Sequence, residues 1–319
     1  MRLQPVHRLA VRPLCAGPLG ASRLCAHRLP GPLAALAALG LLLALAGCGE
    51  APIPRELAEV QAVAEPLLRA NRIQTTPLRF GLELGDAAPY WAEKAGLCKA
   101  SQQDREAGDA CANWAHQSPA EATSPAQRQI RRLSYLFGSA QARSYPHGLI
   151  TFDRSFFLVH DGDRPALRCV IAHELSHVLR RHSYLASLAA NSTYKDLPEQ
   201  ARQRALAQLS QQQELAADRG AMLMTAIAGH DPKACVQQLL SSAQLDADYA
   251  PEDPLGSHPG QARRLQEAQR YLNGPLQRDL AAWRQRQGRR QAAGEPKPQW
   301  SWDPEHQVLR VQTSPVAAR

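Results

Sequence analysis

Apolar residues recur at helical spacing in many segments, so the sequence predicts a mainly helical protein. In residues 57–72, for example, Leu57, Val60, Ala64 and Leu67 lie on one side of a helix. Similar spacing predicts further helices over residues 126–137, 165–182, 199–228, 232–243, 261–272 and 276–290. Residues 250–260, between the helices expected over 232–243 and 261–272, are rich in proline and glycine and are expected to form a loop.

A few segments instead have the pattern of strands. Apolar and polar residues alternate over 78–84, which predicts a strand. Residues 140–160 predict a strand pair, or one long bent strand, around a turn that contains His147. A further strand is possible over His306–Gln312. The expected fold class is therefore α+β, mainly helical, with a small antiparallel sheet.

The N-terminal region has the features of an export signal. A basic stretch precedes an apolar run from Leu33 to Ala46, which is shorter than the roughly 20 residues that a membrane span needs. The run ends in Leu-Ala-Gly-Cys, which resembles a bacterial lipobox whose cysteine, here Cys48, becomes lipidated. We expect a signal peptide over 1–47 and a tether over 48–56. The alternative is a buried helix or an uncleaved anchor with an incidental cysteine.

The charge of the chain argues against a nucleic-acid partner. Five of the eight net positive charges come from arginines in residues 1–47, a segment without acidic residues. The remainder is only weakly basic, unlike a nucleic-acid-binding domain. The basic helix expected near 276–290 is interpreted as a solvated face, with contact to anionic lipid as the alternative.

Four further cysteines lie in the expected mature chain. A lipid-anchored protein would lie in the periplasm, where disulfides persist. Cys98 and Cys111 flank a polar stretch within an irregular insertion over 85–125, so a disulfide between them is plausible. Cys169 and Cys235 lie among apolar residues and are expected to be buried thiols.

The strongest chemical signal is His173-Glu174-Leu175-Ser176-His177. Residues four apart share one face of a helix, so the two imidazoles can bind one zinc ion. Glu174 lies near that face and is placed to accept a proton from a zinc-activated water. The alternative is a chance match on a surface helix.

A second helix offers the third protein ligand that a catalytic zinc site needs. Glu214 and Asp218 are four residues apart and share a face. Glu214 could bind the zinc while Asp218 accepts the ring N–H of a histidine ligand. Small residues nearby, such as Ala217 and Gly220, would let this helix approach the first one closely. A solvated acidic pair is the alternative.

Three motifs together resemble the HtpX-like and BepA-like zinc metallopeptidases, which are related to the CAAX prenyl protease. They are the run from Ala172 to His182, the run from Glu214 to Asp218, and Ser257-His258-Pro259 followed by Arg264. The resemblance implies a gluzincin-type domain that binds one Zn²⁺ per chain. It also implies that His258 lies on a loop over the cleft, beside Arg264, and that both act near the substrate carbonyl or regulate access.

The segment before the metal helix matches that family in outline. The resemblance implies that the run containing Tyr145, Pro146 and Gly148 is an edge strand that pairs with extended substrate. Two side chains typical of the family are absent there. His147 is interpreted as a turn residue. His182 is expected on the same helix as His173 but rotated away from the metal face, with a structural role or in solvent.

These observations lead to one hypothesis and two alternatives. The hypothesis is a zinc-dependent endopeptidase over residues 57–272, with a C-terminal extension over 273–319. It would act on protein or peptide substrates such as misfolded or misassembled envelope proteins. It would be held at a membrane in the periplasm, with the outer membrane favoured over the inner. The alternatives are a non-catalytic zinc-containing chaperone or binding module, and hydrolysis of a non-peptide bond.

Overall fold

The computed structural model describes residues 52–73, 77–99, 111–245, 252–288 and 297–313. The expected signal peptide and Cys48 lie outside these residues. Within the described ranges, no helix combines the length and the apolar character needed to cross a membrane.

The described strands form one five-stranded sheet in the order β2-β3-β1-β5-β4. β1 and β3 pair in parallel, whereas the other three pairs are antiparallel. The prediction of an antiparallel sheet was therefore wrong for the central pair. The chain between β1 and β3 is long enough to return to the starting end of the sheet, which a parallel pair requires. The strands are β1 (Leu78–Glu83), β2 (Ala142–Ser144), β3 (Leu149–Asp153), β4 (Pro298–Asp303) and β5 (Val308–Thr313).

The strand predicted over 140–160 was only partly right. β2 and β3 form a pair, but the apolar residues that follow belong to a short helix, α5 (Arg154–Val159). Phe156 is buried whereas Leu158, two residues later, is exposed, as expected for a helix with one face on the core and not for a strand, where these two residues would share a face. A short apolar run does not by itself distinguish a strand from a helix.

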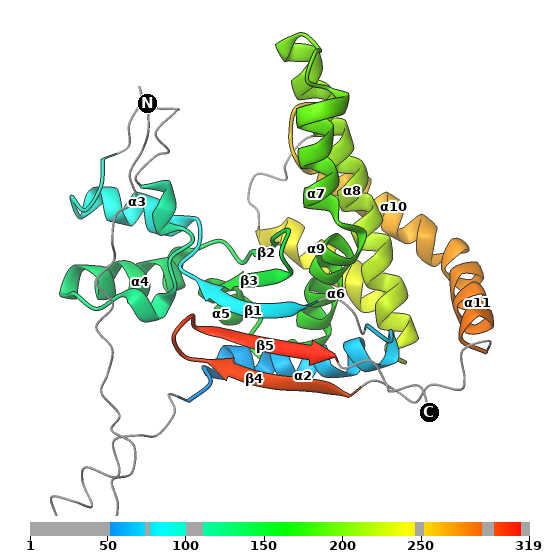
Figure 1. Ribbon diagram of the computed structural model, residues 1–319, viewed down its shortest axis with the longest axis horizontal. Coiled ribbons are helices and arrows are strands. Elements are labelled where there is room, and N and C mark those ends of the chain that lie inside the picture. Colours follow the sequence, from blue (N-terminus) through cyan, green and yellow to red (C-terminus); the bar gives the residue numbers. More distant parts are fainter. Residues whose placement is uncertain (1–51, 74–76, 100–110, 246–251, 289–296, 314–319) are drawn as a thin grey trace, which may run out of the picture. The chain divides into compact units, whose positions relative to one another are not determined.

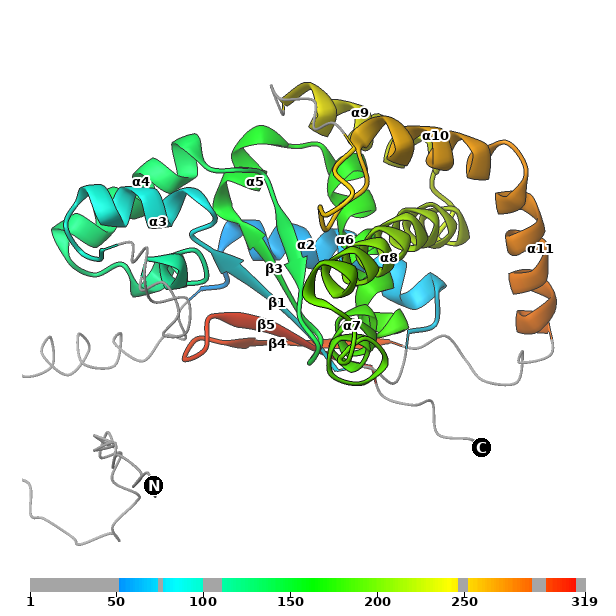
Figure 2. The same ribbon diagram turned by 90° about the horizontal axis from the view of Figure 1, so that it is seen from above.

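More helices lie at one end of the sheet than at the other (Figure 1). α6 to α11 gather beyond one end of the strands, α3 and α4 lie at the other end, and α2 runs along the sheet (Figures 1 and 2). α3 and two short 3-10 helices occupy the region expected to be irregular. The helices are α2 (Arg55–Ala70), α3 (Ala87–Lys94), α4 (Pro125–Phe137), α6 (Arg164–Arg180), α7 (His182–Leu188), α8 (Glu199–Ile227), α9 (Lys233–Leu245), α10 (Gln261–Leu272) and α11 (Pro275–Gly288).

α6 is the central helix of the core. Its first turn is capped by Asp163, whose side chain accepts a hydrogen bond from the Ala166 amide at 3.0 Å. It packs against α2, α8 and α9. Ile171, Ala172 and Leu175 are fully buried there. A helix held on several sides is a rigid base for functional side chains.

Two disulfides stabilise the described chain. One joins Cys98 to Cys111. The other joins Cys169 on α6 to Cys235 on α9, which corrects the expectation of two buried thiols. The packing of α6 on α9 brings the two Cα atoms to 5.1 Å although 66 residues separate them in sequence. Sequence spacing could not reveal this proximity.

Candidate metal centre

The close packing of α6 on α8 builds the site. Gly220 on α8 faces Ser176 on α6, and a Cβ atom at Gly220 would lie 2.2 Å from the Ser176 Oγ atom. Only glycine allows the two backbones to come so near. The small residues noted in the sequence therefore do bring the helix of Glu214 against the helix of the two histidines.

Three side chains converge on one point between these helices. The Nε2 atoms of His173 and His177 lie 3.1 Å apart. The two carboxylate oxygens of Glu214 lie 3.3 Å from these nitrogens, one from each. Among the described residues, these three form the group with metal-ligand chemistry and spacing.

The cluster fits a metal ion in both its atoms and its spacing. Two imidazoles and one carboxylate are a donor set of catalytic zinc sites, which leave one position open. Ligands bound at 2.0–2.1 Å in a tetrahedral arrangement are separated by about 3.3 Å. The observed separations of 3.1 and 3.3 Å agree with that value.

Asp218 and Arg264 support the His173 side of the cluster. The Nδ1 atom of His173 lies 2.9 Å from the Asp218 Oδ1 atom. Arg264, on α10, donates through Nε and Nη2 to the two oxygens of the same carboxylate at 2.9 and 2.7 Å. Burial alone would raise the pKa of Asp218, but the Arg264 charge and the His173 hydrogen bond hold it well below its usual range. Asp218 therefore stays ionised.

Glu174 lies beside the cluster and has the properties of a base. Its side chain is buried, and burial raises its pKa above the usual value. The charge of His173 and a hydrogen bond with Ser144 on β2 oppose this effect. A carboxylate with a raised pKa accepts a proton more readily near neutral pH. Ser144 connects this base to the edge of the sheet.

Glu214 is kept anionic despite its burial. Desolvation opposes ionisation, but the hydrogen bond and charge of His173, together with His258 and His177, outweigh it and lower the pKa to about 2. Burial acts in the opposite sense on His177 and lowers its pKa to about 3. Glu214 as a carboxylate and His177 as a neutral imidazole are in the states that bind metals. Burial lowers the pKa of His173, but Asp218 and Glu214 outweigh it and raise this pKa to about 10, so a metal ion would displace a proton from His173.

His258 lies on the open side of the cluster. Its Nε2 atom is 3.6 Å from the Glu214 Oε2 atom, and its side chain is 62% exposed. Its loop is tied to α8 by Gln211, which donates hydrogen bonds to the carbonyls of Asp253 and Gly256 at 2.9 and 3.1 Å. Gln211 lies one turn before Glu214, so the loop is anchored close to the cluster.

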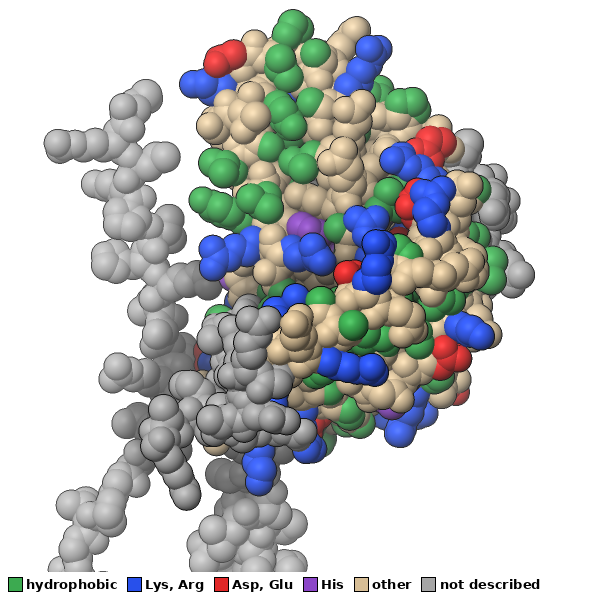
Figure 3. Space-filling view, turned by 90° about the vertical axis from the view of Figure 1, so that its right-hand side faces the viewer, with side chains coloured by type: hydrophobic (Ala, Val, Ile, Leu, Met, Phe, Trp, Pro, Cys, Tyr) green, Lys and Arg blue, Asp and Glu red, His purple; other side chains and the backbone are tan. Residues whose placement is uncertain are grey.

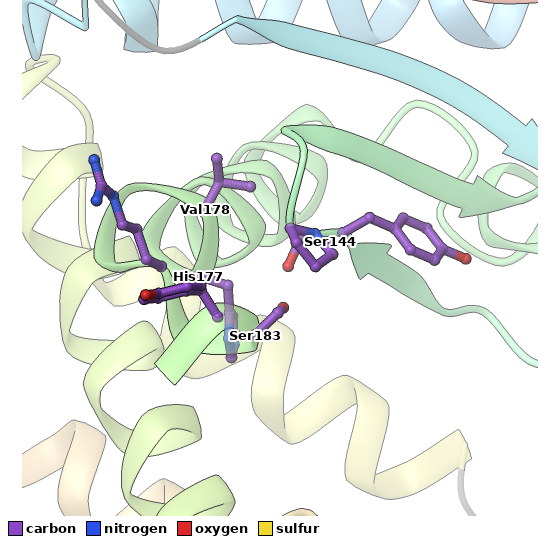
Figure 4. Close-up of a pocket in the computed structure, with 8 residues that line it drawn as sticks. Ser144, His177, Val178 and Ser183 are labelled. Carbon is purple, nitrogen blue, oxygen red and sulfur yellow. The ribbon is translucent and has the colours of Figure 1, made fainter. Parts of the chain in front are cut away.

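A pocket of about 280 Å³ opens beside His177 (Figure 4). Ser144 at the end of β2 and His177 on α6 line it from opposite sides (Figure 4). Tyr145 and Pro146 also line it, but they belong to a turn closed by a hydrogen bond from the Gly148 amide to the Tyr145 carbonyl at 3.0 Å. β2 is an edge strand. The strand itself thus ends one residue before the segment expected to pair with substrate.

The comparisons with known proteins address this part of the chain. Residues 142–272 match the profile described as Peptidase family M48. The chain is a metallopeptidase. The matched segment runs from β2 to the end of α10 and contains every residue of the cluster, so the metal dependence and the hydrolysis of peptide bonds belong to this part. No curated protein and no solved structure matches the chain significantly.

Sequence reasoning missed three residues of the peptidase site. Ser144 and Gln211 carry no motif, and their proximity to Glu174 and to the His258 loop depends on the fold. His182 was expected away from the metal face but is buried, with its Nδ1 atom 3.0 Å from the Nδ1 atom of His177. α6 ends at Arg180, so the wheel position of a continuous helix did not apply.

Proposed function

We propose that the peptidase is a zinc-dependent endopeptidase whose metal is held by His173, His177 and Glu214. The observation that carries this proposal is the convergence of the three ligand groups at 3.1 to 3.3 Å. A bound zinc ion would lower the pKa of water to about 7 and polarise the scissile carbonyl. The resemblance to HtpX-like and BepA-like enzymes and to gluzincins is consistent with this ligand set.

The side chains around the cluster have distinct tasks in this proposal. Glu174 accepts the proton of the attacking water and transfers it to the leaving amine. His258 faces the open side and donates to the carbonyl oxygen as negative charge develops there. Arg264 hydrogen-bonds to Asp218 and does not face the open side of the cluster. Its role in this proposal is therefore to support His173 through Asp218.

Substrate would lie extended along the free edge of β2. The backbone of Ala142–Ser144 pairs with β3 on one side only, which leaves its other side available for strand addition. The turn at Tyr145, Pro146 and Gly148 then continues this path along the pocket wall. Extended binding suits unfolded segments, which supports misfolded or misassembled envelope proteins as substrates.

A pair of glutamate variants tests the chemistry. We expect Glu174→Gln to lower kcat on a denatured protein substrate by about 10²–10⁴-fold, with zinc content unchanged at one ion per chain. Glu93→Gln, at an exposed position of α3, is the matched control and keeps wild-type activity. Retained cleavage in Glu174→Gln would remove Glu174 from the mechanism. Equal inactivity of wild type and variant, with zinc bound, would favour the non-catalytic binding module.

We also propose that the protein is anchored by a lipid in the periplasm, on the basis of the lipobox-like sequence that ends at Cys48. Mass spectrometry of the chain purified from membranes should show an N-terminal, acylated Cys48. Cys48→Ala should move the protein from the membrane fraction. A mature chain that begins elsewhere, or an unmodified Cys48, would refute the anchor.

A further inference from the structure

His182 occupies a position that the end of α6 creates. Arg181 adopts a left-handed conformation, with φ 56° and ψ 39°, and α7 begins at the next residue. The chain turns there instead of continuing along the axis of α6. His182 is consequently brought back toward the preceding turn, where it is only 6% exposed. A non-glycine residue in this conformation is uncommon, so the turn is held by its surroundings.

α8 holds the first residue of α7 in place. The Gln213 side chain on α8 donates a hydrogen bond to the His182 carbonyl at 3.2 Å. Gln213 immediately precedes Glu214, so the same turn of α8 that supplies the carboxylate also fixes the backbone of His182. The turn after α6 and the Gln213 side chain on α8 thus both fix the position of the His182 imidazole relative to the cluster.

The two imidazoles meet through the nitrogens that do not face the cluster. The Nδ1 atoms of His177 and His182 lie 3.0 Å apart, whereas the Nε2 atom of His177 lies among the ligand atoms. A neutral imidazole has one N–H and one lone pair. If Nε2 of His177 offers its lone pair to a metal, its proton is on Nδ1, and the facing Nδ1 of His182 must be the acceptor.

We infer that His182 is a positioning residue, which accepts the Nδ1–H of His177 and so holds that ligand in the tautomer and ring orientation that present Nε2 to the metal. His173 receives the equivalent support from the Asp218 carboxylate. Outer hydrogen bonds of this kind fix the tautomer of a histidine ligand. The two ligands of one helix are thus oriented by different groups, one anionic and one neutral. This inference rests on the proposed metal site.

Two variants at position 182 test the inference through zinc affinity, measured by competition with a chromophoric chelator. His182→Phe keeps an aromatic ring but has no acceptor, and we expect zinc binding about 10–100-fold weaker. His182→Asn places a carbonyl oxygen near the position of Nδ1 and should restore affinity to within a few-fold of wild type. His230→Phe, in the turn after α8, is the matched control and should bind zinc as wild type does.

A measurement on the unmutated chain covers the case in which His182→Phe does not fold. Nitrogen-15 NMR of the zinc-loaded, histidine-labelled protein should show His177 protonated on Nδ1 and His182 protonated on Nε2. A proton on Nδ1 of His182 would overturn the inference. So would equal zinc affinity of wild type and His182→Phe, or an equal loss in His182→Phe and His182→Asn. If wild type binds no zinc, the proposed function itself fails, which is a separate result.

Discussion

Two clusters of buried carboxylates in this molecule are neutralised in different ways. Between α6 and α8, Glu214 faces two imidazoles. At the ends of β1 and β3, Glu83 and Asp153 instead surround the Arg143 guanidinium, which lies 3.3 Å from the first carboxylate and 2.6 Å from the second. We refer to Glu83, Asp86, Arg143 and Asp153 as the Arg143 cluster.

The difference shows how an acidic group becomes available to a metal. In the Arg143 cluster the cation belongs to the protein and occupies the centre, so the carboxylates serve the packing of β2 on the sheet. At the candidate metal centre the nearby arginine, Arg264, is paired with Asp218 instead. Glu214 is left to the imidazoles and to the open side that His258 faces. The face of the molecule seen in Figure 3 carries more lysine and arginine side chains than acidic ones.

The largest effect is expected from removing the metal carboxylate. Glu214→Ala should abolish cleavage and weaken zinc binding by more than the 10–100-fold that the loss of an outer hydrogen-bond partner costs. The zinc-free chain should also melt at a lower temperature, because contacts with His173 and the other imidazoles lower the pKa of Glu214 and so favour the folded state at neutral pH. Zinc titration and melting curves with and without a chelator measure both. Wild-type zinc affinity in the variant would contradict the ligand set.

Loss of the internal cation should act on stability rather than on metal binding. Arg143→Gln leaves the Glu83 and Asp153 carboxylates buried without their cation, which costs about 3–5 kcal/mol of unfolding free energy. Denaturant unfolding of the zinc-free chain measures this cost. Arg132→Gln, at an exposed position of α4, is the control with little expected effect. A cost under about 1 kcal/mol would mean that the Arg143 cluster is not neutralised as its contacts indicate.

The helix contact that builds the metal centre gives an intermediate effect. Gly220→Ala places a methyl group against Ser176 and should destabilise the chain by about 1–3 kcal/mol. It should also weaken zinc binding, since α8 must move away from α6. Gly274→Ala is the control, because no atom lies within 4 Å of its Cβ position and the unfolded state loses entropy. Zinc affinity unchanged in Gly220→Ala would separate the helix contact from the site.

A further prediction concerns the pH dependence of the Arg143 cluster. Burial raises the pKa of Asp153 to about 6 from 3.8, although Arg143 opposes the shift. The folded state therefore holds this proton more tightly than the unfolded state does. The contribution of Asp153 to stability is present below about pH 4 and is lost as the pH rises to about 6.

Comparison with Asp153→Asn isolates this contribution. The unfolding free energy of wild type minus that of the variant, measured on zinc-free chains, should fall between pH 4 and pH 6 and stay constant above it. A difference that rises over this range would show that Arg143 dominates and that the pKa of Asp153 is lowered.

The sequence by itself determined the features that depend on local spacing. His173 and His177 are one helical turn apart, and so are Glu214 and Asp218, so each pair shares a face whatever the rest of the chain does. Apolar residues at helical spacing also predicted helices, and the structure contains most of them. Gly220 and its small neighbours also indicated that α8 packs closely against another element.

The tertiary structure decided everything that joins distant segments. The Cys169–Cys235 disulfide, the parallel pairing of β1 with β3 and the approach of Ser144 to Glu174 depend on packing, which no local pattern encodes. His182 shows the limit most clearly. One residue in a left-handed conformation, Arg181, ends α6 and redirects the imidazole toward His177. A change at a single backbone position reorients all that follows, so extrapolating a regular helix across it fails.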